Sequence, residues 1–257
     1  MLRRLRILAL LLVLVAVATG TWLDRIQTTD WDGPLLVALY PVNADGSAAA
    51  ASEIRSGNTT NADELTAFFA SEAVEHGVQL DRPLRFVVAP AVADAPPLLA
   101  ADTGPLGAMA WSLKLRWWNL GIDDPPGPTP TIRLFLLFHD PALSPRVPHS
   151  AGLQKGLLGI AHLFAAGHMA GSNQVVIAHE LLHTLGASDK YDLATNQPRY
   201  PDGFAEPDRS PRYPQAFAEL MAGRIPDSAA ESHTPESLDQ VLIGPLTAVE
   251  IGWRGGR

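Results

Sequence analysis

Short apolar runs alternate with amphipathic stretches along the first half of the chain. Apolar runs at 34–40, 84–89 and 131–139 are bounded by Gly or Pro and predict buried strands. The stretch from 61 to about 76 opens with Asn61, a capping residue type, and keeps its apolar residues on one face, which predicts a helix.

A second helix is predicted from Pro105 to Leu120, closed by Gly121. Four apolar residues recur in it at helical spacing: Leu106, Met109, Leu113 and Trp117. The resulting order of strand, helix, strand, helix and strand predicts an α/β fold with helices packed on a sheet.

The pattern weakens after residue 141, where 152–158 and 159–166 predict two further strands, one of them at the sheet edge. A clearer helix is predicted over 172–186, with Ser172 or Asn173 as its N-cap and Gly186 as its C-cap.

The last third of the chain shows little periodicity. Residues 189–227 are rich in Pro, Gly, Asp and Tyr and predict ordered loop. The sequence Thr234-Pro235-Glu236 resembles a helix start, and the pattern is interrupted at Gly244-Pro245 and resumes to Gly252. We therefore expect the chain to end in a helix.

The N-terminus has the features of a targeting segment. Arg3, Arg4 and Arg6 precede an uncharged, mostly apolar run from Ile7 to Trp22. Residues 1–25 are therefore predicted to be a signal peptide or an N-terminal membrane anchor. We expect an extracytoplasmic protein, secreted, periplasmic or anchored, that meets the membrane only through this segment.

Composition limits the chemistry that the chain can perform. A net charge of −8 disfavours nucleic acid as a partner, and the oligomeric state is left open. The chain has no cysteine, so disulfides, thiolate zinc sites and cysteine nucleophiles are excluded. Any metal ion must be bound by His, Asp, Glu or Tyr.

The run His179-Glu180-Leu181-Leu182-His183 carries the strongest chemical signal. Residues four apart lie on one face of a helix, so His179 and His183 can bind one zinc ion. A zinc ion bound there would lower the pKa of a bound water to about 7. Glu180 is placed to act as the general base that takes the proton of that water.

A catalytic zinc ion needs a third ligand, and Asp189 is the first candidate. Gly186 follows the second histidine by three residues, which lets the helix end and the chain turn back toward the metal. Other carboxylates or imidazoles could take this place if the chain folded back differently: Asp192, Glu219 and His233.

The residues His179, Glu180, His183, Gly186 and Asp189 match the pattern H-E-x-x-H-x-x-G-x-x-D, which resembles the metzincin zinc peptidases, and most closely the snapalysin type. The resemblance implies a twisted mixed sheet with an antiparallel edge strand, backing helices, an active-site helix and a loop-rich C-terminal subdomain that ends in a helix. It also implies a methionine turn beneath the metal. The segment 219–223 around Met221 is its candidate, although Met221 could equally be a core residue.

The resemblance and the element pattern together predict one catalytic domain over residues 30–257, with an upper part at 30–186 and a lower part at 187–257. Three tyrosines in the lower part could donate to an oxyanion, with no order among them: Tyr191, Tyr200 and Tyr213. Several carboxylates could hold a structural calcium ion, although at no regular spacing: Asp189, Asp192, Asp202, Glu206 and Asp208.

The favoured function is an exported zinc endopeptidase that acts on peptide or protein substrates. One alternative is an exported or anchored binding protein that keeps the fold without the chemistry of Glu180. Another is a zinc hydrolase of non-peptide amides. Four histidines that precede the helix are expected to be core or surface residues: His139, His149, His162 and His168.

Overall fold

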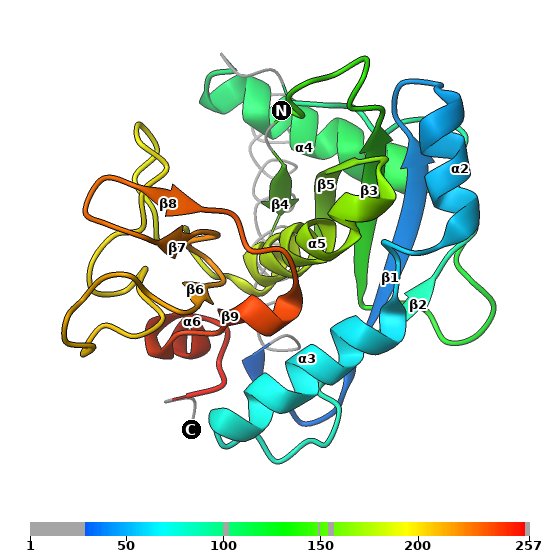
Figure 1. Ribbon diagram of the computed structural model, residues 1–257. Helices are drawn as coiled ribbons and strands as arrows, with labels where there is room; N and C mark the ends of the chain where they lie inside the picture. Colours follow the sequence, from blue (N-terminus) through cyan, green and yellow to red (C-terminus); the bar gives the residue numbers. More distant parts are fainter. Residues whose placement is uncertain (1–28, 100–102, 149, 154–156, 255–257) are drawn as a thin grey trace, which may run out of the picture.

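The computed structural model describes residues 29–99, 103–148, 150–153 and 157–254. Its centre is a five-stranded sheet in the order β2-β1-β3-β5-β4 (Figure 1). The strands are β1 (Leu35–Asn43), β2 (Leu84–Val88), β3 (Ile132–His139), β4 (Ala151–Leu153) and β5 (Leu158–Phe164). β4 pairs antiparallel with β5 at the edge, and the other strands run parallel. The predicted mixed α and β fold is therefore confirmed, including an antiparallel edge strand.

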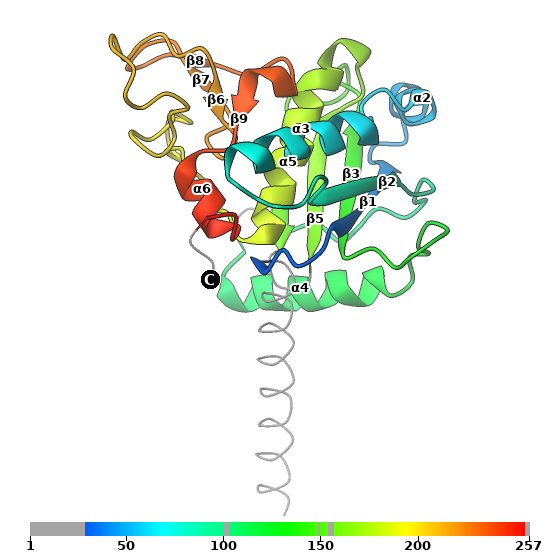
Figure 2. The ribbon, with the colours of Figure 1, turned by 90° about the horizontal axis from the view of Figure 1, so that it is seen from below.

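Helices cover both faces of the sheet, as buried parallel strands require. One face packs against α2 (Ala48–Ser56), α3 (Ala62–Glu75) and α5 (Ala170–Leu185). The opposite face packs against α4 (Pro105–Asn119), which lies along that side of the domain (Figure 2). The helix α2 was not predicted, because its start at Ala48–Ala51 resembles a low-complexity tract.

The orientation of α4 differs from a simple interpretation of its apolar spacing. Leu115 is fully buried against the sheet, and the ring of Trp118 packs on Phe135 with a centroid distance of 4.7 Å. The four apolar residues noted at helical spacing, from Leu106 to Trp117, are instead exposed. Both sides of this helix are apolar, and only one of them faces the core.

The helix α5 begins earlier than predicted, at Ala170 after a 3₁₀ turn, so neither Ser172 nor Asn173 is its N-cap. The Asn173 side chain instead pairs with the backbone of Phe164, and Ser172 Oγ donates to Pro235 O at 2.8 Å. Gly186 ends the helix at φ 105°, as predicted.

The C-terminal part is mostly loop, as predicted, with short pieces of regular structure. These are β6 (Ala218–Glu219), β7 (Ile225–Pro226), β8 (Ser232–His233), β9 (Val241–Leu242) and α6 (Pro245–Glu250).

The prediction of a helix starting at Thr234 is wrong. The segment contains only a 3₁₀ turn at Leu238–Gln240, because Val241 and Leu242 pair as a strand with β6. The final helix starts instead at Pro245.

Hydrophobic side chains from both predicted parts of the domain share one core. Leu181 of α5 and Met221, Ile243 and Trp253 of the C-terminal part belong to the same buried cluster. The predicted signal or anchor segment, residues 1–25, lies outside the described residues. Among the residues that the structure describes, no helix is long and apolar enough to cross a membrane.

Candidate metal centre

The C-terminal half of α5 brings two imidazole rings together. His179 and His183 are one helical turn apart, and their ring centroids lie 4.7 Å from each other. Gly186 then reverses the chain, with Ala187 N donating to Leu182 O at 2.9 Å. This reversal carries the following loop back across the two rings.

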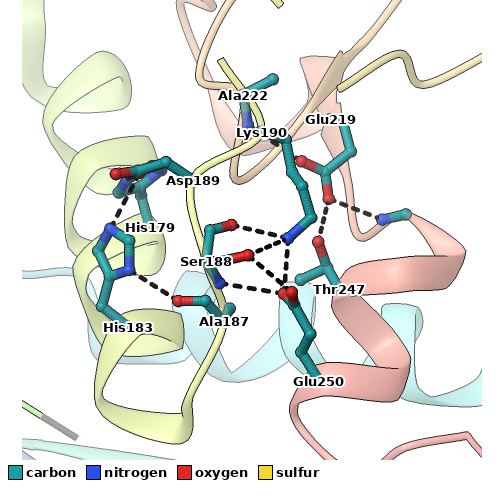
Figure 3. Close-up of polar contacts among 11 residues, drawn as sticks. His179, His183, Ala187, Ser188, Asp189, Lys190, Glu219, Ala222, Thr247 and Glu250 are labelled. Atoms are coloured by element: carbon teal, nitrogen blue, oxygen red, sulfur yellow. Dashed lines mark hydrogen bonds and ion pairs between the residues drawn. The ribbon is translucent and has the colours of Figure 1, made fainter. Parts of the chain in front are cut away.

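Asp189 is the residue that this loop delivers. Its Oδ1 atom lies 3.3 Å from His179 Nε2 and 3.2 Å from His183 Nε2 (Figure 3). A tetrahedral zinc ion with bonds of about 2.0–2.1 Å separates its ligand atoms by about 3.3 Å. The donor set and its spacing therefore fit a zinc ion, with a fourth position left open.

Hydrogen bonds to backbone carbonyls orient both rings. His179 Nδ1 lies 2.9 Å from Leu220 O, and His183 Nδ1 lies 2.9 Å from Ala187 O. Because a carbonyl oxygen only accepts, each Nδ1 carries the hydrogen. A neutral ring then presents the Nε2 lone pair toward Asp189, as metal-binding histidines do.

With both Nδ1 atoms protonated, the two Nε2 atoms and Asp189 Oδ1 are all acceptors. Three acceptor atoms so close together need a cation between them. Asp189 Oδ1 is buried and has no hydrogen-bond partner apart from the two Nε2 atoms that it faces. In the metal-free chain a proton supplies the charge. Burial lowers the pKa of His179, but the bond to Asp189 and the charge of Glu180 outweigh it and raise the pKa to about 9. Burial raises the pKa of Asp189, and the two histidines outweigh it and lower that pKa.

Glu180 lies beside the two histidines, with a carboxylate oxygen within 4.8 Å of their ligand nitrogens. The side chain is buried, and Oε2 has no hydrogen-bond partner. Burial raises the pKa of this carboxyl, and the neighbouring histidines only partly offset it. A carboxylate with a raised pKa and an unused acceptor is suited to taking up a proton.

A second network holds Asp189 from the side away from the histidines. Lys190 is buried, and its Nζ donates to Ser188 O and Ser188 Oγ at 2.8 Å and to Glu250 at 2.6 Å. Glu250 also accepts from Ser188 N at 3.0 Å. The residues on both sides of Asp189 are thus tied to α6 (Figure 3). The sequence contains no signal for this pairing, because its partners are 60 residues apart.

The turn at 219–223 contacts both His179 and the loop that carries Asp189. Ala222 N and Gly223 N donate to Glu219 O at 2.9 and 3.0 Å, and Leu220 O accepts from His179. Met221 is fully buried in the core, and its carbonyl accepts from Lys190 N at 2.9 Å. The segment expected to be a methionine turn is therefore a tight turn in contact with the candidate ligand His179.

The three rival ligands have other partners. Glu219 is fully buried and accepts from Thr247 Oγ1 at 2.6 Å. Asp192 accepts from the backbone of Ala194 and Thr195 at 3.0 Å. His233 pairs with an aspartate in the β7–β8 hairpin. Of the four candidates for the third ligand, the structure brings Asp189 to the histidines.

The structure also separates the three tyrosines. Tyr191 lines the cavity that contains Glu180, and burial followed by the charges of Asp189 and Glu180 raises its pKa. Tyr200 and Tyr213 both pack against Phe204 instead. Only Tyr191 is therefore placed to meet a bound molecule at the centre.

The expected calcium ligands do not gather. Within the described ranges, no group of three or more candidate ligand side chains with closely spaced atoms includes Asp192, Asp202, Glu206 or Asp208. Glu206 pairs with an arginine at 2.8 Å rather than with the neighbouring aspartates. The structure therefore gives no support to a calcium site in this loop.

Of the other histidines, His139 and His162 are buried and bond to each other at 2.9 Å. Burial lowers the pKa of both, so the pair is neutral at physiological pH. His168 is exposed on the turn before α5, and His149 lies outside the described residues. The described ones match the expectation of core or surface histidines.

An open cavity of about 220 Å³ is lined in part by His179 and Glu180. Its walls include Val175 and Val176 of α5, Ala222 of the supporting turn and Arg224, the residue before β7. The centre is therefore accessible to a ligand from a mainly apolar cleft.

Comparison with protein-family models finds no match for the chain, and comparison with curated proteins finds none either.

Proposed function

We propose that this protein is an exported zinc-dependent endopeptidase, with His179, His183 and Asp189 as zinc ligands and Glu180 as general base. One observation carries the proposal: the Nε2 atoms of His179 and His183 both lie 3.2–3.3 Å from the same carboxylate oxygen, Asp189 Oδ1. Nearly identical separations are expected around a tetrahedral metal ion with one open position. Retained metzincin-like spacing from His179 to Asp189 adds support from the sequence.

A zinc ion bound here supplies Lewis-acid chemistry, by polarising a carbonyl group and increasing the acidity of a water molecule. Glu180 then accepts a proton from the attacking water, since its Oε2 is an acceptor without a partner beside the two histidines. The protonated carboxyl returns this proton to the departing amine nitrogen. Tyr191 lines the same cavity, and its hydroxyl donates to the carbonyl oxygen as negative charge develops.

The cleft suits an extended peptide. Val175, Val176 and Ala222 offer apolar contacts for a substrate side chain beside Glu180. The strand β4 lies at the edge of the sheet and pairs on one side only, with β5. An extended substrate can add to such an edge through backbone hydrogen bonds. This arrangement favours a peptide over a small amide as the substrate.

Zinc content and cleavage of an unfolded protein test the proposal together. We expect about one zinc ion per chain in the wild type, lost in His183→Ala and in Asp189→Ala. His233→Ala is the matched control, since His233 was a rival ligand and is exposed at the β7–β8 hairpin. Glu180→Gln should keep the zinc ion and lose about 10²–10⁴-fold in cleavage rate.

Other results would support a different function. A zinc-loaded wild type that cleaves no peptide, and whose biological role survives Glu180→Gln, would indicate the binding-protein alternative. Cleavage of non-peptide amides alone would indicate the other hydrolase. A wild type that takes up no zinc when the metal is supplied would refute the proposal.

A further inference from the structure

The exposed side of α4 carries a continuous apolar stripe. Five large side chains each expose between 64% and 81% of their surface there: Leu106, Met109, Leu113, Trp117 and Leu120. Their spacing of three or four residues places them along one line of the helix. Scattered apolar residues are normal on a protein surface, but a stripe along a whole helix marks a contact surface.

The stripe is not needed to hold α4 in place. On the other side of the helix, Leu115 is fully buried and Trp118 packs on Phe135. Trp111 Nε1 donates to Pro97 O at 2.7 Å. The helix is thus anchored through its opposite side, which leaves the stripe facing outward.

The charges of α4 indicate what the stripe contacts. The helix has no acidic residue, although the chain as a whole has a net charge of −8. Lys114 and Arg116 are its two basic residues, and helical geometry places them on opposite flanks of the stripe. An apolar face with tryptophan and flanking basic side chains is typical of a helix that lies in the interface of an anionic membrane.

The position of this domain along the chain points the same way. The apolar run that ends at Trp22 is the predicted signal or anchor, and the described domain begins at residue 29. Seven residues span at most about 25 Å. Where the apolar run stays in the bilayer, it keeps the domain at the membrane surface.

We propose that the stripe of α4 binds the surface of a lipid bilayer that contains anionic headgroups. It forms a contact separate from the N-terminal segment and fixes the orientation of the domain. The metal centre is on α5, which packs on the opposite face of the sheet (Figure 2). The cleft therefore lies on the side of the sheet away from the lipid and is open to soluble substrates.

A labelling experiment on the full-length chain tests this inference. Because the chain has no cysteine, Leu113→Cys provides a unique site for an environment-sensitive fluorophore. Val74→Cys on α3 is the matched control, since Leu113 and Val74 are both 68% exposed and lie on opposite faces of the sheet. Vesicles of phosphatidylcholine and phosphatidylglycerol are prepared with brominated acyl chains, which quench a fluorophore that enters the bilayer.

We expect the chain to float with the vesicles, and the label at 113 to lose fluorescence to the brominated lipid while the label at 74 does not. Lys114→Glu should reduce this loss in anionic vesicles more than in pure phosphatidylcholine. Urea unfolding should stay unchanged in both cysteine variants, because the labelled positions lie outside the core.

Three results would overturn the inference. A chain that does not float with the vesicles has no lipid contact. Equal quenching of the two labels, or of neither, means that the stripe is not the contact. Protection of the label at 113 from aqueous iodide without quenching by brominated lipid means that protein covers the stripe, either a second copy or the N-terminal segment.

Discussion

Glu219 gives the sharpest test of how the metal centre is built, because its two interpretations differ in what they predict. As a zinc ligand it would be required for metal binding and dispensable for folding. As a structural carboxylate it would be required for folding and dispensable for metal binding. Its Oε1 accepts from Thr247 Oγ1 at 2.6 Å and Gly244 N at 3.1 Å, and its Oε2 accepts from Ala222 N at 3.0 Å. These contacts favour the structural role.

The change Glu219→Gln removes one of the two acceptor oxygens in this network. A glutamine has one acceptor oxygen, so it turns an amide N–H toward at least one buried donor that Glu219 now accepts from. An unpaired buried polar group costs about 1–3 kcal/mol. Burial raises the pKa of Glu219, so removing its charge gives part of this back. We expect the metal-free chain to lose about 2 kcal/mol of unfolding free energy, which lowers Tm by about 4–8 °C.

Urea unfolding of the metal-free chain measures this loss, and metal analysis after zinc is supplied measures binding. Asp189→Asn is the matched control, because it replaces a carboxylate by the same amide at the proposed ligand. We expect Glu219→Gln to keep one zinc ion per chain and Asp189→Asn to lose it. If Glu219→Gln left the metal-free stability unchanged and abolished zinc binding, the reasoning would be refuted and Glu219 would be the ligand.

Two further predictions concern the elements around the centre. Gly171→Ala should lower the free energy of urea unfolding by about 1–3 kcal/mol, because the Cβ of the new alanine would overlap the Glu236 carbonyl oxygen. Gly167→Ala is the control and should leave stability unchanged, because there is open space around Gly167. Burial raises the pKa of Glu250, but hydrogen bonds from Lys190 and the loop outweigh it and hold the pKa below its ordinary 4.5. The Lys190–Glu250 pair therefore contributes stability above pH 4.5 that is lost as the pH falls. Glu250→Gln should remove this part of the pH dependence of the unfolding free energy. The same pH dependence in the variant and the wild type would contradict the prediction.

The part of the centre that depends on local geometry could be predicted from the sequence. His179, Glu180 and His183 lie on one helix, where a spacing of four residues determines which side chains meet. Gly186 ends that helix in a conformation that glycine adopts readily, at φ 105°. The sheet was predictable for a related reason, since strands buried on both faces are continuous apolar runs.

Features that depend on packing between distant segments could not be predicted. Apolar residues line both sides of α4, and periodicity alone cannot tell that Leu115 faces the sheet while Leu113 faces outward. The proline signature at Pro235 also failed. The carbonyl of Pro235 accepts a hydrogen bond from Ser172 Oγ on α5, and the backbone of Glu236 crosses the same helix at Gly171, where there is no side chain. This segment therefore packs on α5 and does not start a helix of its own.

Asp189, the proposed third ligand, depends on both local spacing and contacts with a distant segment. Spacing after Gly186 makes Asp189 available, but a loop carboxylate with free rotation would bind a metal ion weakly, because binding would have to order it. Lys190 is buried and tied to Glu250 on α6, at the far end of the chain from the helix that carries the histidines. The final helix therefore contributes no ligand of its own, yet it holds the loop in the position where Asp189 meets both rings. The short motif supplies the side chains of the proposed centre, and the contact of its loop with α6 fixes the position of Asp189.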